Sequence, residues 1–203
     1  MVWQNLNSCN EKTGLAMKNK VESVTLLAMI KGRVNMRQQQ SQMRDRRIPA
    51  ELTTWLYASG SLTQQLTDLA QGIFKVEPNA EHFQRLSLSD ARWMKMPAHH
   101  TAWVRESHLY GCEAQPWVKA KSIFPILSLQ GRARIFQHIG KKPIGYYLFQ
   151  RTTPACERRV LLLEDGWTRQ SCYTWHGCKF IVQETFLPAF EQYIRQQSLR
   201  TSS

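Results

Sequence analysis

The sequence predicts an α+β fold in which helices pack on a single antiparallel β-sheet. Helix-type apolar spacing dominates residues 49–72, and the segments after residue 102 are mostly strand-like and follow one another along the chain. Short connections between these segments, such as His176-Gly177, are typical of antiparallel hairpins. Helices first and sequential strands afterwards indicate the α+β class.

Two helices are expected at the start of the globular region. The first begins at Pro49 and ends at Gly60, and its apolar residues share one face: Leu52, Trp55 and Leu56. Ser61 caps the second helix, and Gln64 completes an S-x-x-Q capping box. The second helix continues to Gly72 with an apolar stripe formed by Leu62, Leu66 and Leu69. Ordinary core packing is the simplest explanation of this stripe.

Strand-like segments make up most of the remaining chain. A short one covers Gly72–Val76, and a connection of six residues joins Ala102–Tyr110 to Trp117–Phe124, which predicts an antiparallel pair. Two short helices are expected at Arg132–Ile139 and from Pro143 to Leu148. Three further strands are expected after them, at Arg159–Leu163, Thr168–Trp175 and Lys179–Leu187.

The bulk composition fits one globular domain. The chain has 203 residues, of which 42% are hydrophobic. Its longest apolar run, residues 21–30, is far shorter than the roughly 20 residues that span a bilayer, so we expect no stable membrane insertion. The polar first residues do not resemble a secretory signal, so we expect a cytoplasmic protein, and we expect it to be a monomer.

Cysteine and histidine spacing favours neither a structural metal site nor a redox dithiol. The five cysteines are widely spaced without a C-x-x-C pair, which predicts free thiols; a disulfide between Cys172 and Cys178 is the alternative. His99 and His100 point in opposite directions if the chain is extended, and we expect them to form a turn after Pro97. We therefore predict that the protein contains no metal.

The net charge of +12 is unevenly distributed. Residues 1–47 carry nine Lys/Arg and three Asp/Glu, which gives +6 from less than a quarter of the chain. We expect this basic stretch to be a flexible N-terminal extension, followed by one domain over residues 48–195 and a C-terminal tail over 196–203. A nucleic-acid-binding module is an alternative, but no DNA- or RNA-binding motif accompanies the charge, so no nucleic-acid partner is predicted. A basic domain also suits a dianionic small molecule.

Two charged residues interrupt strands that are otherwise apolar. Alternation places Arg105 on one strand face with Trp103 and Leu109. The same alternation places Glu184 on a face with apolar residues only: Phe180, Val182 and Phe186. An unpaired charge on a buried apolar face costs several kcal/mol, so each side chain is expected to have a partner or a ligand. Arg105 and Glu184 could also pair with each other, or face outward from a half-exposed sheet.

Four segments together resemble the chorismate lyase family, over about residues 49–193. In family order they are Ser61-Leu62-Thr63, Trp103-Val104-Arg105-Glu106, the stretch from Gly140 to Phe149, and Glu184-Thr185-Phe186-Leu187-Pro188. The resemblance implies a ligand enclosed beneath helical flaps on the sheet. It also implies cofactor-independent elimination of pyruvate from chorismate to give 4-hydroxybenzoate, the first committed step of ubiquinone synthesis.

The resemblance further implies roles for individual residues. Arg105 would bind the ring carboxylate through its two-pronged guanidinium, and Glu184 would anchor the ring hydroxyl. Ile144 would offer a backbone amide and an apolar wall, and Leu62, where the family more often has methionine, would act from the flap. Lys121, where the family has arginine, would bind the second carboxylate; an exposed strand lysine is the alternative. A non-catalytic sensor of the same fold, as in bacterial transcription regulators, is the competing function.

Overall fold

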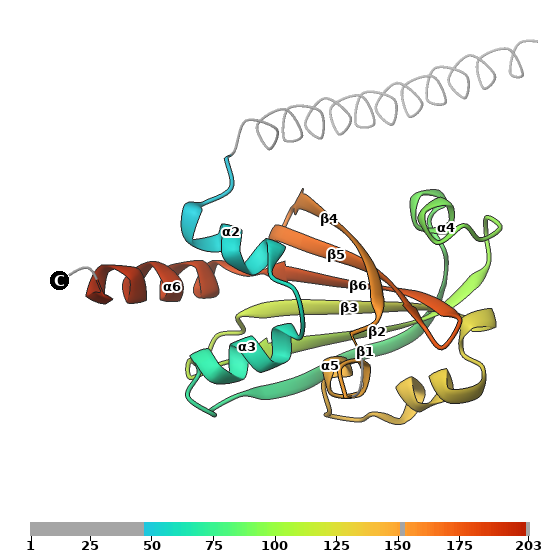
Figure 1. Ribbon diagram of the computed structural model, residues 1–203, viewed down its shortest axis with the longest axis horizontal. Coiled ribbons are helices and arrows are strands. Elements are labelled where there is room, and N and C mark those ends of the chain that lie inside the picture. Colours follow the sequence, from blue (N-terminus) through green and yellow to red (C-terminus); the bar gives the residue numbers. More distant parts are fainter. Residues whose placement is uncertain (1–46, 151–152, 202–203) are drawn as a thin grey trace, which may run out of the picture. The chain divides into compact units, whose positions relative to one another are not determined.

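The fold is built on one six-stranded antiparallel sheet, whose strand order is β1-β2-β3-β6-β5-β4 (Figure 1). The computed structural model describes residues 47–150 and 153–201, and the predicted extension over residues 1–47 lies almost wholly outside these ranges. The strands are β1 (Lys75–Arg85), β2 (Thr101–Tyr110), β3 (Val118–Pro125), β4 (Ala155–Leu163), β5 (Gly166–Trp175) and β6 (Cys178–Phe186). The predicted α+β class with a single antiparallel sheet is thereby confirmed.

Helices precede, interrupt and follow the strands in the sequence. The α-helices are α2 (Ala50–Tyr57), α3 (Leu62–Leu69), α4 (Leu88–Met94), α5 (Ile144–Leu148) and α6 (Pro188–Thr201). Two 3-10 helices, η1 (Ile126–Ser128) and η2 (Gly131–His138), lie between β3 and α5. The amphipathic helix expected at 132–139 is therefore a 3-10 helix. Because α6 continues to Thr201, the predicted boundary at residue 195 falls inside a helix.

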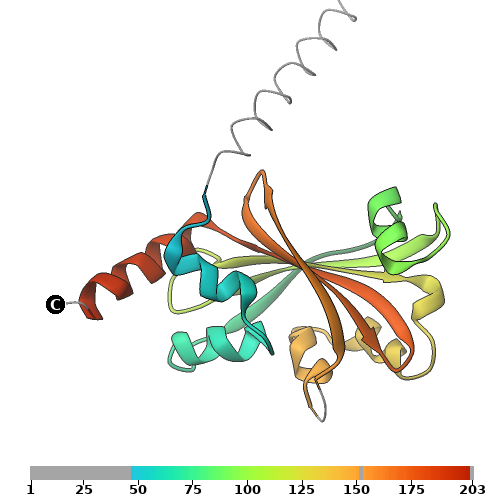
Figure 2. The same ribbon diagram turned by 45° about the horizontal axis from the view of Figure 1, so that its top comes forward.

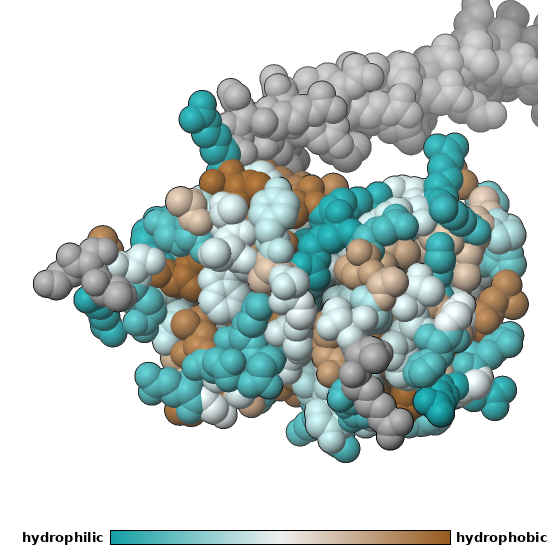
Figure 3. All heavy atoms as spheres, in the orientation of Figure 1, coloured by the Kyte–Doolittle hydropathy of each residue, from teal (hydrophilic) through white to brown (hydrophobic). Residues whose placement is uncertain are grey.

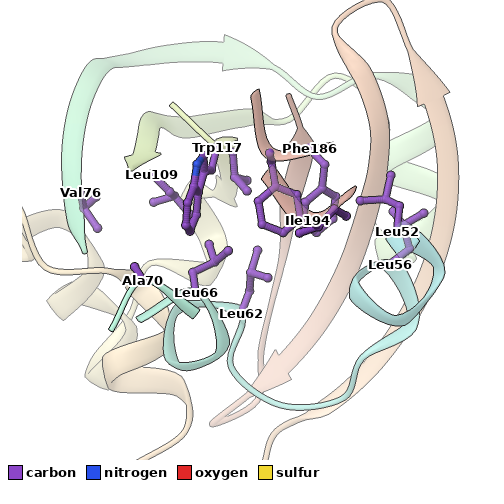
Figure 4. Close-up of a cluster of buried hydrophobic side chains, with 12 residues drawn as sticks. Leu52, Leu56, Leu62, Leu66, Ala70, Val76, Leu109, Trp117, Phe186 and Ile194 are labelled. Atoms are coloured by element: carbon purple, nitrogen blue, oxygen red, sulfur yellow. The ribbon is translucent and has the colours of Figure 1, made fainter. Parts of the chain in front are cut away.

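The capping signal at Ser61 positions α3 as the sequence predicts. The Ser61 hydroxyl accepts a hydrogen bond from the Gln64 backbone N–H at 3.3 Å. The Gln64 side chain instead donates to Asp68 at 2.8 Å, so only one half of the capping box is observed. Leu62 and Leu66 are buried and point into the cluster shown in Figure 4, toward Trp117.

Helices cover both faces of the sheet (Figure 2). On one face, α2, α3 and α6 pack on the end of the sheet that carries Val118 and Phe186, while η2 and α5 pack on the end that carries Phe124 and Phe180. On the opposite face, α4 packs on the apolar residues of the central strands: Val104, Ile123, Cys172 and Ile181. The first face thus has two apolar ends, and the charged residues lie between them.

Apolar side chains gather inside the molecule. The large apolar residues that remain exposed belong to separate elements and connections, among them Tyr57, Ile73, Phe83, Tyr146 and Leu199. The face seen in Figure 3 accordingly shows small, scattered hydrophobic groups among hydrophilic side chains. Cys172 and Cys178 are free thiols, which agrees with the preferred prediction and not with the disulfide alternative.

Several elements of the described structure were not predicted from the sequence, including the 14-residue helix α6 and the short 3-10 helix η1. Strand β1 continues to Arg85, well beyond the short strand expected at 72–76. It pairs only with β2 and is exposed along most of its length, so its side chains show no apolar alternation. Helix α4 was also missed, although its N-cap Ser87 accepts a hydrogen bond from the Asp90 backbone N–H at 3.0 Å.

Candidate active site

Strand register brings Arg105 and Glu184 to the same face of the sheet. Arg105 of β2 lies opposite Ser122 of β3, and Glu184 of β6 lies opposite Ala120 of the same β3 strand. Ala120 and Ser122 are two residues apart, so all four side chains point to one face. Because β3 presents only small side chains here, no bulky β3 residue separates the arginine from the glutamate.

Helices α3 and α5 cover this part of the face and form the roof of the candidate site. Helix α3 packs on the apolar cluster at one end through Leu62 and Leu66, and α5 packs on the cluster at the other end through Ile144 and Leu148. The two helices approach so closely that a Cβ added at Gly145 would lie 2.8 Å from the Ser61 hydroxyl. The charged residues are therefore enclosed between the sheet and two short helices.

The guanidinium of Arg105 is buried with incomplete compensation. The side chain is 4% exposed, and its Nε lies 3.5 Å from Glu81 Oε1 without a hydrogen bond in the described part of the chain. Nη2 donates to the Gly140 carbonyl, in the connection that leads into α5. Burial lowers the pKa of Arg105, and the attraction of half-exposed Glu81 only partly opposes this. Arg105 thus retains donor capacity for an anionic ligand.

Glu184 has a buried partner in Arg169 of β5, directly opposite it in the sheet. Arg169 Nε donates to Glu184 Oε2 at 2.5 Å, and Nη1 donates to the carbonyls of Trp55 and Ala58 at 3.1 and 3.4 Å. Burial alone would lower the pKa of Arg169, which is 1% exposed, but the charge and hydrogen bond of Glu184 raise it overall. The pair therefore holds Glu184 in one orientation and anchors the end of α2.

Neither alternative considered for the two charges is observed. Arg105 and Glu184 do not pair with each other, since their recorded ion-pair partners are Glu81 and Arg169. They do not face outward either, because Arg105 is buried and the Glu184 side chain is only 12% exposed. Two separate charged groups on one covered face are the arrangement expected of a ligand-binding site.

Leu62 and Ile144 lie at corresponding places in the roof. Each is the first residue of its helix, Leu62 in α3 and Ile144 in α5. The Leu62 side chain is 3% exposed within the apolar cluster of Figure 4, as the core-packing explanation requires. Ile144 is half-buried against the other cluster, with Pro143 before it as the N-cap. The structure therefore brings both residues to the roof above the charged row.

Lys121 is not brought to this site. It lies opposite Glu106 and Gln183, one residue away from Ser122, and so projects from the other face of the sheet. Its Nζ forms an ion pair with Glu106 at 3.2 Å. The hypothesis that Lys121 binds the same ligand as Arg105 is therefore corrected: this lysine belongs to a partly exposed polar row on the opposite face.

Two arginines on the site face were missed from the sequence. Arg169 and Arg158 lie on the same face as Glu184, on β5 and β4. The alternation rule that singled out Arg105 applies equally to Arg169, which shares its strand face with the aromatic residues Trp167 and Tyr173. Arg158 carried a weaker signal, because an arginine follows it immediately and either of the two can face solvent.

No group of three or more metal-ligating side chains occurs within residues 47–150 and 153–201. Helices long and apolar enough for a bilayer crossing are likewise not found in that part of the chain. His99 forms part of a turn and has a positive φ of 65°, in agreement with the turn expected after Pro97.

Comparison with known proteins decides the family. Residues 33–196 match the family model described as chorismate lyase. The chain belongs to the chorismate lyase family. It is 73% identical over 160 residues to a probable chorismate pyruvate-lyase from Acinetobacter baylyi, a match that covers 79% of this chain and 96% of that protein. A probable chorismate pyruvate-lyase from Psychrobacter cryohalolentis is 43% identical over 148 residues, covering 70% and 88% of the two chains.

Solved structures of similar shape come from transcription regulators. The effector domain of PhnF from Mycobacterium smegmatis aligns with a TM-score of 0.48 and 11% identity, over 64% of this chain and 90% of that one. The ligand-binding domain of a putative GntR-family regulator from Bordetella bronchiseptica aligns with a TM-score of 0.43 and 13% identity, over 57% and 84%.

Proposed function

We propose that this member of the chorismate lyase family converts chorismate into 4-hydroxybenzoate and pyruvate, with Arg105 and Glu184 as its catalytic residues. The observation that carries the proposal is the pair of opposite charges on one covered sheet face, buried Arg105 and largely buried Glu184. Their Cα atoms are offset by two strands and two residues, which corresponds to roughly 12 Å. The side chains of both residues lie on the same face of the sheet, so we propose that one six-membered ring bound between them contacts both.

The reaction is an elimination that balances without an added redox partner. The bond between a ring carbon and the enolpyruvyl ether oxygen breaks, and the neighbouring carbon, which carries the hydroxyl, loses its hydrogen. The leaving group gains that hydrogen to become pyruvate, and the ring becomes aromatic. Aromatisation supplies the driving force, so we expect turnover without a metal or an organic cofactor.

The proposed role of Arg105 is to bind the ring carboxylate. A guanidinium and a carboxylate form parallel charge-assisted hydrogen bonds that fix orientation as well as distance. The Nε of Arg105, which is buried without a hydrogen bond among the described residues, supports this role because a ligand carboxylate would satisfy it. The backbone amide of Ile144 is proposed to donate to the same carboxylate from the start of α5.

The proposed role of Glu184 is to accept a hydrogen bond from the ring hydroxyl. Its hydrogen bond and ion pair with buried Arg169 support this role, because they hold the carboxylate in one orientation. Leu62 is proposed to act as an apolar wall from α3. A closed roof would exclude water from the ring, which strengthens both polar contacts.

The proposal is tested by mixing the purified protein with chorismate in buffer that contains EDTA and following 4-hydroxybenzoate and pyruvate. We expect the two products in equal amounts, at a rate that EDTA does not change. Failure to form either product would contradict the proposed activity. Activity that disappears only with EDTA would contradict the prediction that no metal is needed. Tight binding of chorismate without turnover would favour the sensor alternative.

A further inference from the structure

Adjacent arginines of β4 project from opposite faces of the sheet and have different partners. Arg159 lies on the α4 side, where it forms an ion pair with Asp90 at 3.3 Å and its guanidinium lies 4.2 Å from the Trp93 ring centre. Arg158 lies opposite Ser171, on the face that carries Arg105 and Glu184.

The Arg158 guanidinium is oriented by neutral groups. Its Nε donates to the Ser171 hydroxyl at 3.0 Å, and its Nη1 donates to the Ala58 carbonyl at the end of α2. No carboxylate forms an ion pair with it in the part of the chain that the structure describes. Arg105, Arg159 and Arg169, by contrast, each have a recorded carboxylate partner. Arg158 is thus a cation held in a fixed position, and its charge has no ion-pair partner among the described residues.

A pocket of about 300 Å³ opens beside Arg158. Arg158 and Arg159 line it together with Tyr57, Phe149, Val160 and Tyr173, but the guanidinium of Arg159 is paired with Asp90. Val160 lies directly opposite Arg169, which in turn lies opposite Glu184, so the pocket borders the charged row on the β4 side. Neither Arg105 nor Glu184 lines it. Burial raises the pKa of Tyr173 to about 12, so its phenol stays protonated and presents no negative charge to this pocket.

The proposed substrate requires a second cation on this side of the site. In chorismate, the ring carbon that bears the enolpyruvyl ether is next to the one that bears the hydroxyl. If the hydroxyl contacts Glu184, the carboxylate of the enolpyruvyl group must lie on the Glu184 side of the ring. Two carboxylates close together repel each other unless a cation is also present. Arg169 already neutralises Glu184, which leaves Arg158 as the neighbouring charge on this face.

We propose that Arg158 and the pocket beside it form the subsite for the enolpyruvyl carboxylate of chorismate, and for pyruvate as it leaves. This inference rests on the proposed function. Arg158 lies two strands from Glu184 on the β4 side of the sheet, and Arg105 lies two strands from it on the β2 side. Each arginine is also shifted from Glu184 by two residues along the strand, so both Cα–Cα distances are roughly 12 Å. The three charged residues thus suit the three polar ends of the substrate.

The test compares Arg158→Met with Lys121→Met. Each substitution removes one positive charge, so the long-range attraction of a dianion is reduced similarly in both. Only Arg158 lies on the site face, so only Arg158→Met removes a direct contact. We expect Arg158→Met to lower kcat/KM for chorismate by about tenfold or more, through a higher KM. We expect its Kd for 4-hydroxybenzoate to stay within about twofold of wild type, because that ligand lacks the second carboxylate. Lys121→Met should leave both constants within about twofold.

Three outcomes would overturn the subsite. They are an unchanged KM in Arg158→Met, an equal loss of chorismate and 4-hydroxybenzoate affinity, or an equal effect of Lys121→Met. Equal loss would mean that Arg158 only anchors the end of α2 through Ala58. If Arg158→Met does not fold, Arg158→Lys serves instead, with the charge retained and a severalfold rise in KM expected for chorismate alone.

The subsite and the proposed activity fail in different ways. If wild-type protein does not turn chorismate over, Kd for chorismate replaces KM in the same comparison. Weaker chorismate binding in Arg158→Met alone would then support the subsite while the lyase activity is contradicted. Turnover by wild type with unchanged kinetics in Arg158→Met would support the activity and overturn the subsite. Absence of chorismate binding to wild type would overturn both.

Discussion

Replacing Arg105 with methionine is expected to lower kcat/KM for chorismate at least about a hundredfold, the scale of a lost preorganised electrostatic contact. We also expect binding of 4-hydroxybenzoate to fall by a similar factor, because substrate and product share the ring carboxylate. Steady-state kinetics and equilibrium titration with the product measure the two effects. Arg105→Lys keeps the charge but loses the two-pronged geometry, so it should lie between wild type and Arg105→Met.

The same substitution should not destabilise the fold. Arg105 is 4% exposed, its Nε has no hydrogen bond among the described residues, and Glu81 compensates it only from 3.5 Å. Methionine of similar length removes a poorly compensated buried charge, so we expect an unchanged or higher Tm. A variant with normal kinetics would contradict the assigned role of Arg105. A variant that loses activity only because it unfolds would leave no evidence for a direct contact with the ligand.

Replacing Glu184 with alanine is expected to reduce both activity and stability. Turnover should fall at least about a hundredfold, because the contact with the ring hydroxyl is lost. The free energy of unfolding should fall by about 3–5 kcal/mol, because Arg169, which is 1% exposed, would keep its charge without a counter-charge. Chemical denaturation and steady-state kinetics measure the two losses separately.

The double variant Glu184→Leu with Arg169→Met separates the two roles of Glu184. Replacing both members of a buried ion pair with apolar residues is often neutral for stability, so we expect the double variant to recover most of the lost stability. Its activity should stay as low as that of Glu184→Ala. Recovery of activity together with stability would show that Glu184 acts only through the fold. A single variant as stable as wild type would contradict the tight Glu184–Arg169 pair.

Alternation within single strands singled out Arg105 and Glu184, and the family resemblance then favoured a ligand-binding role for both. Arg105 and Glu184 stood out because the residues two positions away are apolar, and the structure places both charges on the covered face. The role expected for Lys121 came from the family resemblance instead, and a match of sequence positions does not show which face of the sheet a strand residue occupies. That choice depends on the β2–β3 register, which pairs Arg105 with Ser122 and not with Lys121.

Edges of the fold were less predictable than its centre. Strand β1 is an edge strand with Pro78 inside it and polar side chains on both faces, so no apolar pattern marks it. Arg158 lies on the opposite edge strand, β4, where every residue is partly or largely exposed. Its orientation is set by the hydrogen bonds to Ser171 and Ala58, and contacts between residues so far apart in the chain are not visible in the sequence.

A crystal structure of the protein with 4-hydroxybenzoate tests the central claim most directly. We predict that the ring lies beneath α3 and α5, with its carboxylate on Arg105 and its hydroxyl on Glu184. A ring bound elsewhere, or one bound in the reverse orientation, would contradict the account.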